Sequence, residues 1–214
     1  MSKLEACSRR LDRRQALRTL AATVSLAAGC GGTVTSAHRH EAAELARESM
    51  SVDLHSHAGM LRSSTTSLDG QLGRMARGTL KASLFCAVGD GPVLGRRPQS
   101  GFYAVREPRA GELCNYTYSS LGLVTSRAAA GTLLIIERPA DLDAARAQSK
   151  PGAILAVEGG DFLEGRIERV REAYDRGIRC IQLTHYRINE LGDIQTEAPR
   201  HGGLTPCRRR AGYL

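Results

Sequence analysis

Apolar and polar positions alternate in blocks along the middle of the chain. Four apolar runs have the length of buried strands: residues 82–89, 133–136, 152–160 and 178–185. Five stretches have helical spacing or helix-forming composition: residues 38–48, 68–77, 112–130, 139–148 and 162–176. Strands that alternate with helices in this way predict an α/β fold with a parallel sheet.

The third quarter of the chain carries the clearest signal. The run Gly152–Gly160 is an apolar strand that ends in an acid and two glycines. Residues 162–176 predict a helix, Gly177 ends it, and residues 178–185 form the next strand. Upstream, residues 90–111 are rich in Gly, Pro and Arg and predict one long loop.

Length and charge narrow the class of protein. A chain of 214 residues suffices for one domain with a core, but a complete (β/α)8 barrel usually needs about 250. Of the net charge of +8, a surplus of four lies in residues 1–29 and three in residues 207–214. With no basic cluster in the middle and no Trp, the sequence argues against nucleic acid as a partner.

The N-terminus has the pattern of an export signal. Arg13 and Arg14 precede a small, apolar stretch at residues 19–29, which is typical of a twin-arginine signal peptide. A short amphipathic helix of the folded domain is the alternative, which continuous apolarity without a 3.6-residue period disfavours. Cleavage is expected either before Cys30, which would then be lipidated, or after residues 35–37.

These features divide the chain into three parts. Residues 1–37 are expected to be a signal peptide and short linker, residues 38–206 the folded domain, and residues 207–214 an aberrant basic tail. The expected location is the periplasm or the cell envelope, with membrane contact only through a lipid on Cys30. Cys86 and Cys180 lie in apolar runs and predict buried free thiols, while a disulfide in the exported protein stays open.

Metal-ligating residue types stand at the ends of the predicted strands. In the extended segment 51–57, alternation places Asp53, His55 and His57 on one side. Glu158 and His185 end two later strands. Because the carboxyl ends of parallel strands meet at one edge, His55, His57, Glu158 and His185 are expected to converge on a metal site. Asp53 is expected to support the site rather than bind the ion.

Each of these residues has a simpler interpretation when taken alone. A His-x-His pair is often a surface pair, a Glu before two glycines is often part of a turn, and a strand-end histidine is often hydrogen-bonded in a core. It is their position at successive strand ends that favours a metal. With a bridging carboxylate, two ions about 3.5–4 Å apart activate a water and polarise a carbonyl.

Three stretches together resemble the membrane dipeptidase family. They are residues 157–160 (VEGG), residues 177–185 (GIRCIQLTH) with Asn189, and residues 201–206 (HGGLTP). The resemblance covers about residues 50–206, corresponding to the N-terminal part of the family. It implies a binuclear zinc hydrolase on a (β/α)8 barrel that cleaves dipeptides, of which this chain holds about the first half.

The resemblance also implies roles for particular residues. The first-strand metal pair falls on His55 and His57, where the family has His-x-Asp; the bridging glutamate falls on Glu158. The family's substrate-binding histidine falls on His185, which is expected to hold the scissile carbonyl or the developing oxyanion. His201 is not expected to replace a missing ligand. Two further metal histidines and an acidic residue of the family lie beyond this similarity.

Three functions follow as expectations. The first is a zinc metallodipeptidase whose activity is impaired by C-terminal truncation and whose second metal site is incomplete. The second is a non-catalytic, exported metal-binding remnant. The third is another amidohydrolase-type hydrolase, which the Glu-Gly-Gly and Leu-Thr-His contexts disfavour. A homo-oligomer or a partner chain that completes the barrel stays open.

Overall fold

The computed structural model describes residues 36–60, 67–98 and 101–206. The chain divides into two compact units, residues 1–45 and 46–214. Helix α2, Ser36–Glu48, confirms the helix predicted at residues 38–48. The predicted signal peptide, Cys30 and the basic tail lie outside the described residues. None of the described helices combines the length and the apolarity needed to cross a bilayer.

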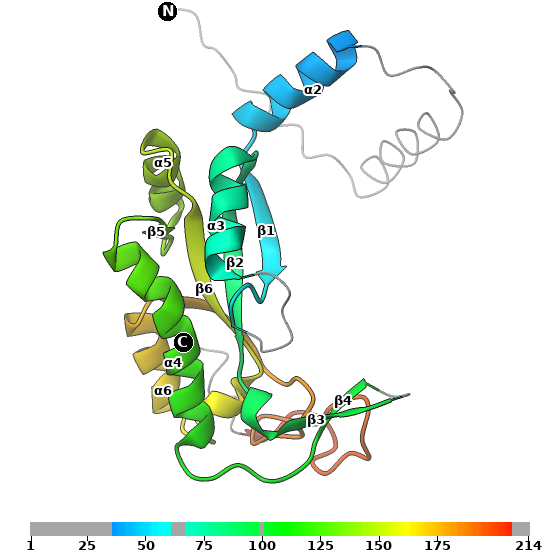
Figure 1. Ribbon diagram of the computed structural model, residues 1–214. Helices are drawn as coiled ribbons and strands as arrows, with labels where there is room; N and C mark the ends of the chain where they lie inside the picture. Colours follow the sequence, from blue (N-terminus) through cyan, green and yellow to red (C-terminus); the bar gives the residue numbers. More distant parts are fainter. Residues whose placement is uncertain (1–35, 61–66, 99–100, 207–214) are drawn as a thin grey trace, which may run out of the picture. The chain divides into compact units, whose positions relative to one another are not determined.

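A parallel sheet forms the centre of the second unit (Figure 1). Its main strands are β1 (Ser51–Ser56), β2 (Leu80–Val88), β6 (Gly152–Glu158) and β7 (Ile178–Gln182), paired in that order. The short strand β5, Leu134–Ile135, pairs with the first residues of β6. The structure thus confirms the α/β class and the mostly parallel sheet.

The register across the sheet decides which side chains share a face. Phe85 pairs with Leu155, and both belong to the hydrophobic core. One residue further along, Cys86, Ala156 and Cys180 stand side by side on the opposite face. Two residues beyond these, Glu158 also lies on this opposite face. The parity of β6 therefore turns its terminal carboxylate away from the core.

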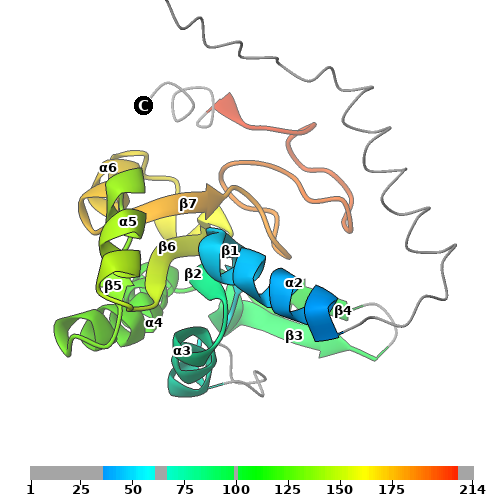
Figure 2. The ribbon, with the colours of Figure 1, turned by 90° about the horizontal axis from the view of Figure 1, so that it is seen from above.

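Four helices cover the core face of the sheet. They are α3 (Leu68–Arg77), α4 (Glu112–Ala129), α5 (Pro139–Ala147) and α6 (Glu168–Asp175). Figure 2 shows them on one side of the strands. Leu72 and Met75 of α3 and Val124 of α4 are buried in the same cluster as Phe85 and Leu155. Helix packing on one face leaves the other face and the strand ends free to form a site.

The prediction of one long loop at residues 90–111 was wrong. This segment contains a 3-10 turn, η1 (Gly91–Val93), and an antiparallel hairpin of β3 (Leu94–Arg97) and β4 (Gly101–Ala104). The hairpin is short and has no apolar alternation that would reveal it. A cation–π contact joins its two strands, with the guanidinium of Arg97 on β3 lying 4.0 Å from the ring centroid of Tyr103 on β4.

The prediction of a helix over residues 162–176 was too long at its start. Residues Gly160–Leu163 form a second 3-10 turn, η2, and α6 begins only at Glu168. Phe162 and Leu163 are buried, so their apolar spacing reflects packing rather than helical period. Glu164 and Gly165 have φ values of 49° and 70°, which interrupt the helical path.

The prediction of two buried thiols held for one cysteine only. Cys86 is buried, but Cys180 is exposed, because β7 pairs with β6 alone among the described strands and Cys180 faces away from the helices. Cys114 of α4 is a further buried free thiol.

Candidate metal centre

His55 and His57 converge at the end of β1. Their Nε2 atoms are 2.9 Å apart, closer than the roughly 6–7 Å between alternate residues of a regular strand. The pairing register with β2 is also irregular here, between Asp53 and Ser56. Asp53 shapes the segment, since its carboxylate accepts from the backbone N–H of His55 at 3.1 Å and from the hydroxyl of Ser83 at 3.3 Å.

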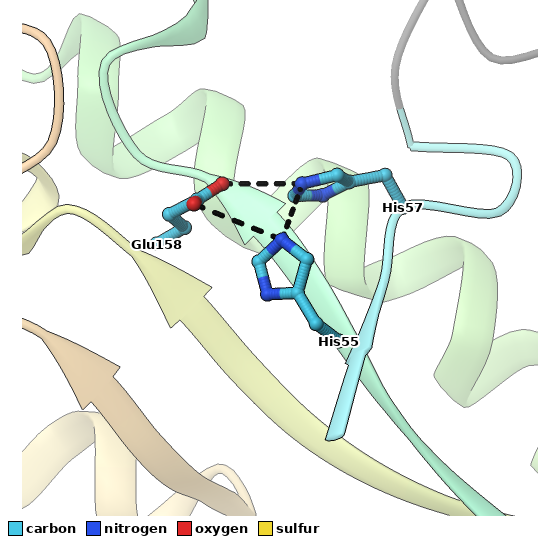
Figure 3. A group of neighbouring side chains, drawn as sticks. All are labelled: His55, His57 and Glu158. Carbon is cyan, nitrogen blue, oxygen red and sulfur yellow. Dashed lines mark hydrogen bonds and ion pairs between the residues drawn. The ribbon is translucent and has the colours of Figure 1, made fainter. Parts of the chain in front are cut away.

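Glu158, at the end of β6, completes the cluster (Figure 3). Its Oε2 lies 3.1 Å from Nε2 of His57, and its Oε1 lies 3.7 Å from Nε2 of His55. One nitrogen or oxygen of each residue lies within 4.8 Å of the others, so all three can reach one ion. Two ligand atoms of a tetrahedral zinc are about 3.4 Å apart, given zinc–nitrogen bonds of about 2.0–2.1 Å.

The hydrogen bonds of His57 show that the cluster suits a cation. Its Nδ1 lies 2.8 Å from the carbonyl oxygen of Cys86, which only accepts, so Nδ1 carries a hydrogen. In the neutral ring, Nε2 then presents a lone pair to a carboxylate oxygen 3.1 Å away. Two such groups repel each other unless a proton or a metal ion lies between them, so the donor set fits a metal.

The pKa values of the cluster point the same way. Burial lowers the pKa of His57, but the hydrogen bonds to Glu158 and to the Cys86 carbonyl outweigh it, and the net pKa is raised. Burial raises the pKa of Glu158, but the hydrogen bond of His57 and the charges of the neighbouring histidines lower it overall. Without a metal, the cluster therefore favours a protonated His57 beside an ionised Glu158.

His185 reaches the same place from the loop after β7. Its Nε2 lies 3.5 Å from Oε1 of Glu158, and its Nδ1 lies 2.8 Å from Oδ1 of Asp90. Gly159 permits this approach: its φ is +96°, and a Cβ there would come within 3.2 Å of the Cβ of His185. The structure thus brings together His55, His57, Glu158 and His185, as the strand ends predicted, while their roles stay predictions.

Sequence reasoning missed two buried carboxylates beside the cluster. Asp90 follows the end of β2, and Asp161 follows the end of β6; both are fully buried. Asp161 accepts from the guanidinium of Arg187 at 2.9 Å and from the amide of Asn189 at 3.0 Å. Burial and the charge of Asp90 raise the pKa of Asp161 to about 6. An acid next to glycine at a strand end was the available signal for Asp90.

The cluster opens into a cavity of about 710 Å³. His57, Glu158 and His185 line it together with an apolar wall. That wall comprises Val88, Pro92, Leu94, Phe102, Tyr116 and Tyr186. Much of it comes from residues 91–104, the segment predicted as an irregular loop.

His201 lies apart from this cluster among the described residues. It is exposed, and its backbone N–H donates to the carboxylate of Asp193 at 3.0 Å. Backbone N–H groups of Arg200 and Gly203 donate to the same carboxylate, at 2.8 Å each. The His-Gly-Gly segment thus forms a loop closed on Asp193.

A parallel sheet with helices on one face and polar residues at the carboxyl strand ends is consistent with part of a TIM-type barrel. The chain belongs to the membrane dipeptidase family (peptidase family M19), whose sequence model matches residues 39–210. This family is metal-dependent, and membership supports a peptidase hydrolase. No curated protein sequence matches the chain.

Solved structures share this fold at low sequence identity. An amidohydrolase from Pseudomonas aeruginosa is 20% identical with a TM-score of 0.54, over 79% of this chain and 43% of that one. The probable dipeptidase PvdM from the same organism is 15% identical with a TM-score of 0.56, over 80% and 45%. A metallo peptidase from Rhodobacter sphaeroides, liganded with a phosphinate mimic of the dipeptide L-Ala-D-Ala, is 16% identical with a TM-score of 0.50, over 75% and 54%. The chain therefore spans about half the length of these relatives.

Proposed function

We propose that this chain carries the first metal-binding half of a zinc metallodipeptidase site. The observation that carries the proposal is the convergence of His55, His57 and Glu158 beside His185, at a cavity that His57, Glu158 and His185 line, in a membrane dipeptidase family member. Two imidazoles and a carboxylate form a donor set that zinc prefers. The Nε2 of His57 and the carboxylate of Glu158, 3.1 Å apart, require a proton or a metal ion between them, which supports a cation at this place.

Each residue has a defined task in this proposal. His55, His57 and Glu158 hold zinc, which when bound polarises the scissile carbonyl and lowers the pKa of a water. The carbonyl of Cys86 fixes the ring of His57 so that Nε2 faces the ion. His185 directs Nε2 into the cavity, where it contacts the substrate carbonyl or the developing oxyanion. By the family resemblance, Glu158 would also help to hold a second zinc.

The proposed substrate is a dipeptide with an apolar side chain. A cavity of about 710 Å³ has the size of a small-molecule site, and Leu94, Phe102 and Tyr116 give it an apolar wall. The neighbour liganded with a mimic of L-Ala-D-Ala supports a dipeptide as the substrate class. The described residues bring together ligands for one ion, whereas the family resemblance implies a binuclear site, so we infer low turnover from this half-site alone.

Zinc content and hydrolysis of L-Ala-D-Ala, measured on the same purified sample, test this proposal. We expect about one zinc per chain and slow hydrolysis. A chain without zinc would contradict the metal site. About two zincs with fast turnover would contradict the low activity and indicate that self-association or a partner completes the site. Zinc without dipeptide hydrolysis would favour the non-catalytic metal-binding protein, and hydrolysis of a cyclic amide or an ester instead would favour another amidohydrolase.

Export remains part of the proposal. Arg13 and Arg14 support the twin-arginine route, and Cys30 supports a lipid anchor at the cell envelope. Replacing both arginines with lysine is expected to retain the protein in the cytoplasm in cell fractionation. Cys30→Ser is expected to move the exported protein from the membrane fraction to the soluble fraction, and an unchanged distribution would exclude the anchor.

A further inference from the structure

Asp90 uses both of its carboxylate oxygens on two consecutive residues of the cavity wall. Its Oδ1 lies 2.8 Å from Nδ1 of His185, and its Oδ2 accepts from the backbone N–H of Tyr186 at 2.9 Å. The side chain is fully buried. It reaches from the end of β2 past β6 to the loop after β7, connecting residues 95 positions apart.

The backbone on either side of Asp90 is closely packed. A Cβ on Gly89 would lie within van der Waals radii of the carbonyl oxygen of Gly159, on the neighbouring strand end. A Cβ on Gly91 would come within 3.0 Å of the ring of Tyr116. The two glycines let β2, β6 and α4 approach each other and fix the direction from which Asp90 reaches His185.

The chemistry of the pair determines which ring nitrogen faces the cavity. An ionised carboxylate only accepts hydrogen bonds, so the hydrogen of Nδ1 points to Asp90. Nε2 is then the nitrogen turned towards Glu158 and the cavity, 3.5 Å from Oε1. A carboxylate behind a histidine fixes both the tautomer and the ring orientation.

We propose that Asp90 is a positioning residue that sets the ring orientation and tautomer of His185, and that it anchors Tyr186 in the cavity wall at the same time. The effect on catalysis rests on the proposed function, in which His185 contacts the substrate. In Asp90→Asn, one amide oxygen faces two donors, the Nδ1–H of His185 and the N–H of Tyr186. One donor loses its partner, or the amide donates to Nδ1 and the ring hydrogen moves to Nε2.

NMR of the histidine ring nitrogens tests the assignment independently of activity. In the full chain labelled with ¹⁵N-histidine, His185→Gln identifies the signal of His185. We expect the neutral ring of the wild type to carry its hydrogen on Nδ1, and Asp90→Asn to shift both ring-nitrogen signals. Wild-type protein with the hydrogen on Nε2 would overturn the proposal, whether or not the variant folds.

Asp161→Asn is the matched control. Asp161 is an equally buried carboxylate that holds the same loop through Arg187 and Asn189, and no described contact joins it to the His185 ring. We expect Asp161→Asn to leave the ring-nitrogen signals of His185 in place. Equal shifts in both variants would mean that Asp90 acts only on loop stability, which would overturn the assignment.

Kinetics on the zinc-loaded full chain give the second readout. Asp90→Asn is expected to lower kcat per bound zinc by about 10- to 100-fold, with the zinc stoichiometry retained, because Asp90 touches none of the three ligand groups. An unchanged kcat per zinc would overturn the catalytic part of the proposal. If the wild type binds zinc but hydrolyses no dipeptide, the proposed function fails, and the ring-nitrogen signals still decide whether Asp90 positions His185.

Discussion

The two sides of the cavity are built differently. On the β1 side, the side chain of His55 is 51% exposed, and the ring contacts that the described residues provide are to His57 and Glu158. On the β6–β7 side, His185 is 12% exposed and has the buried carboxylate of Asp90 behind it. The comparison teaches that buried carboxylate contacts hold the β6–β7 side, whereas fewer contacts fix the ring of His55 on the β1 side.

His57 lies between these extremes. Its side chain is 21% exposed, and a backbone carbonyl rather than a carboxylate holds its Nδ1. The carbonyl belongs to Cys86 in the middle of the sheet, so the ring orientation follows from strand pairing. A carbonyl orients the imidazole without adding a full negative charge beside the metal ligands. The support behind each histidine thus differs in charge as well as in rigidity.

Removing the carboxylate shared by both sides has the largest expected effect. Glu158→Gln keeps the shape but removes the negative charge that faces His55, His57 and His185. We expect loss of stoichiometric zinc after dialysis, measured by elemental analysis. Glu172→Gln on α6, a glutamate paired with Arg176, is the matched control and retains zinc. Stoichiometric zinc in Glu158→Gln would remove this residue from the site.

The rigidity of the β6–β7 side is tested by a methyl group at Gly159. With φ at +96°, a Cβ there would lie 2.8 Å from Oδ2 of Asp161 and 3.2 Å from the Cβ of His185. Gly159→Ala adds backbone strain and overpacking, each of which costs about 1–3 kcal/mol. We therefore expect the free energy of unfolding, measured in urea, to fall by the sum of the two.

Gly131→Ala separates these two costs. Gly131 has a φ of +75°, and no described atom lies within 4 Å of its Cβ position apart from its chain neighbours. We expect a loss of about 1–2 kcal/mol, the strain alone. Equal losses in the two variants would show that the strand end yields to the added methyl group, and the contrast in rigidity would fail.

A pH dependence is expected from the second buried carboxylate of that side. The pKa of Asp161 is raised to about 6 in the folded protein from an ordinary value of 3.8. Between these values the folded state binds more protons than the unfolded state, so stability falls as the pH rises. The contribution is fully present below pH 4, is lost by about pH 6, and is on the order of 2–3 kcal/mol.

Asp161→Asn removes that group and is expected to flatten the decline. The measurement is the free energy of unfolding in urea at pH 4, 5, 6 and 7, for wild type and variant in parallel. Zinc-free protein is used for both, so that metal binding does not contribute to the pH dependence. Asp161 is not one of the three ligand-type residues of the cluster, so its effect can be measured without zinc. A decline of equal slope in the variant would assign the pH dependence to other groups.

Sequence patterns predicted the strands of the parallel sheet and the convergence of ligand-type residues, because apolar runs mark the strands and the topology places their ends together. Glu158 and His185 follow apolar runs, and the carboxyl ends of parallel strands meet at one edge. The distances could not be predicted, since residue spacing does not fix the side-chain directions that bring Nε2 of His55 within 2.9 Å of Nε2 of His57, nor the irregular register with β2. Alternation alone places alternate residues about 6–7 Å apart, whereas the two ring centroids lie 4.5 Å apart.

What the sequence concealed is the support behind the ligand-type residues. Asp90 and Asp161 contact residues far along the chain, and no local spacing relates Asp90 to His185. The aromatic wall was concealed for a similar reason, because Phe102 comes from a hairpin too short to show alternation. Exposure of Cys180 likewise depends on which strands pair with β7, which its apolar neighbours do not reveal.

The smallest expected effect separates the two histidines of the β1 side. His55→Ala and His57→Ala each remove one imidazole, so both bind zinc more weakly than the wild type. The Cys86 carbonyl holds the ring of His57, whereas the described residues give His55 no such backbone contact, so in the proposed site the ion would order its ring. Ordering a side chain costs about 0.5–1.5 kcal/mol, so His55 contributes less net binding energy. We therefore expect His57→Ala to weaken zinc binding by about 2- to 10-fold more than His55→Ala, in competition titrations with a chelator at constant pH.

His201→Ala, which removes an exposed histidine of the Asp193 loop, leaves the affinity unchanged. Equal affinities for the two β1-side variants would mean that the carbonyl contributes no rigidity to His57, and the difference between the two sides of the cavity would then rest on Asp90 alone.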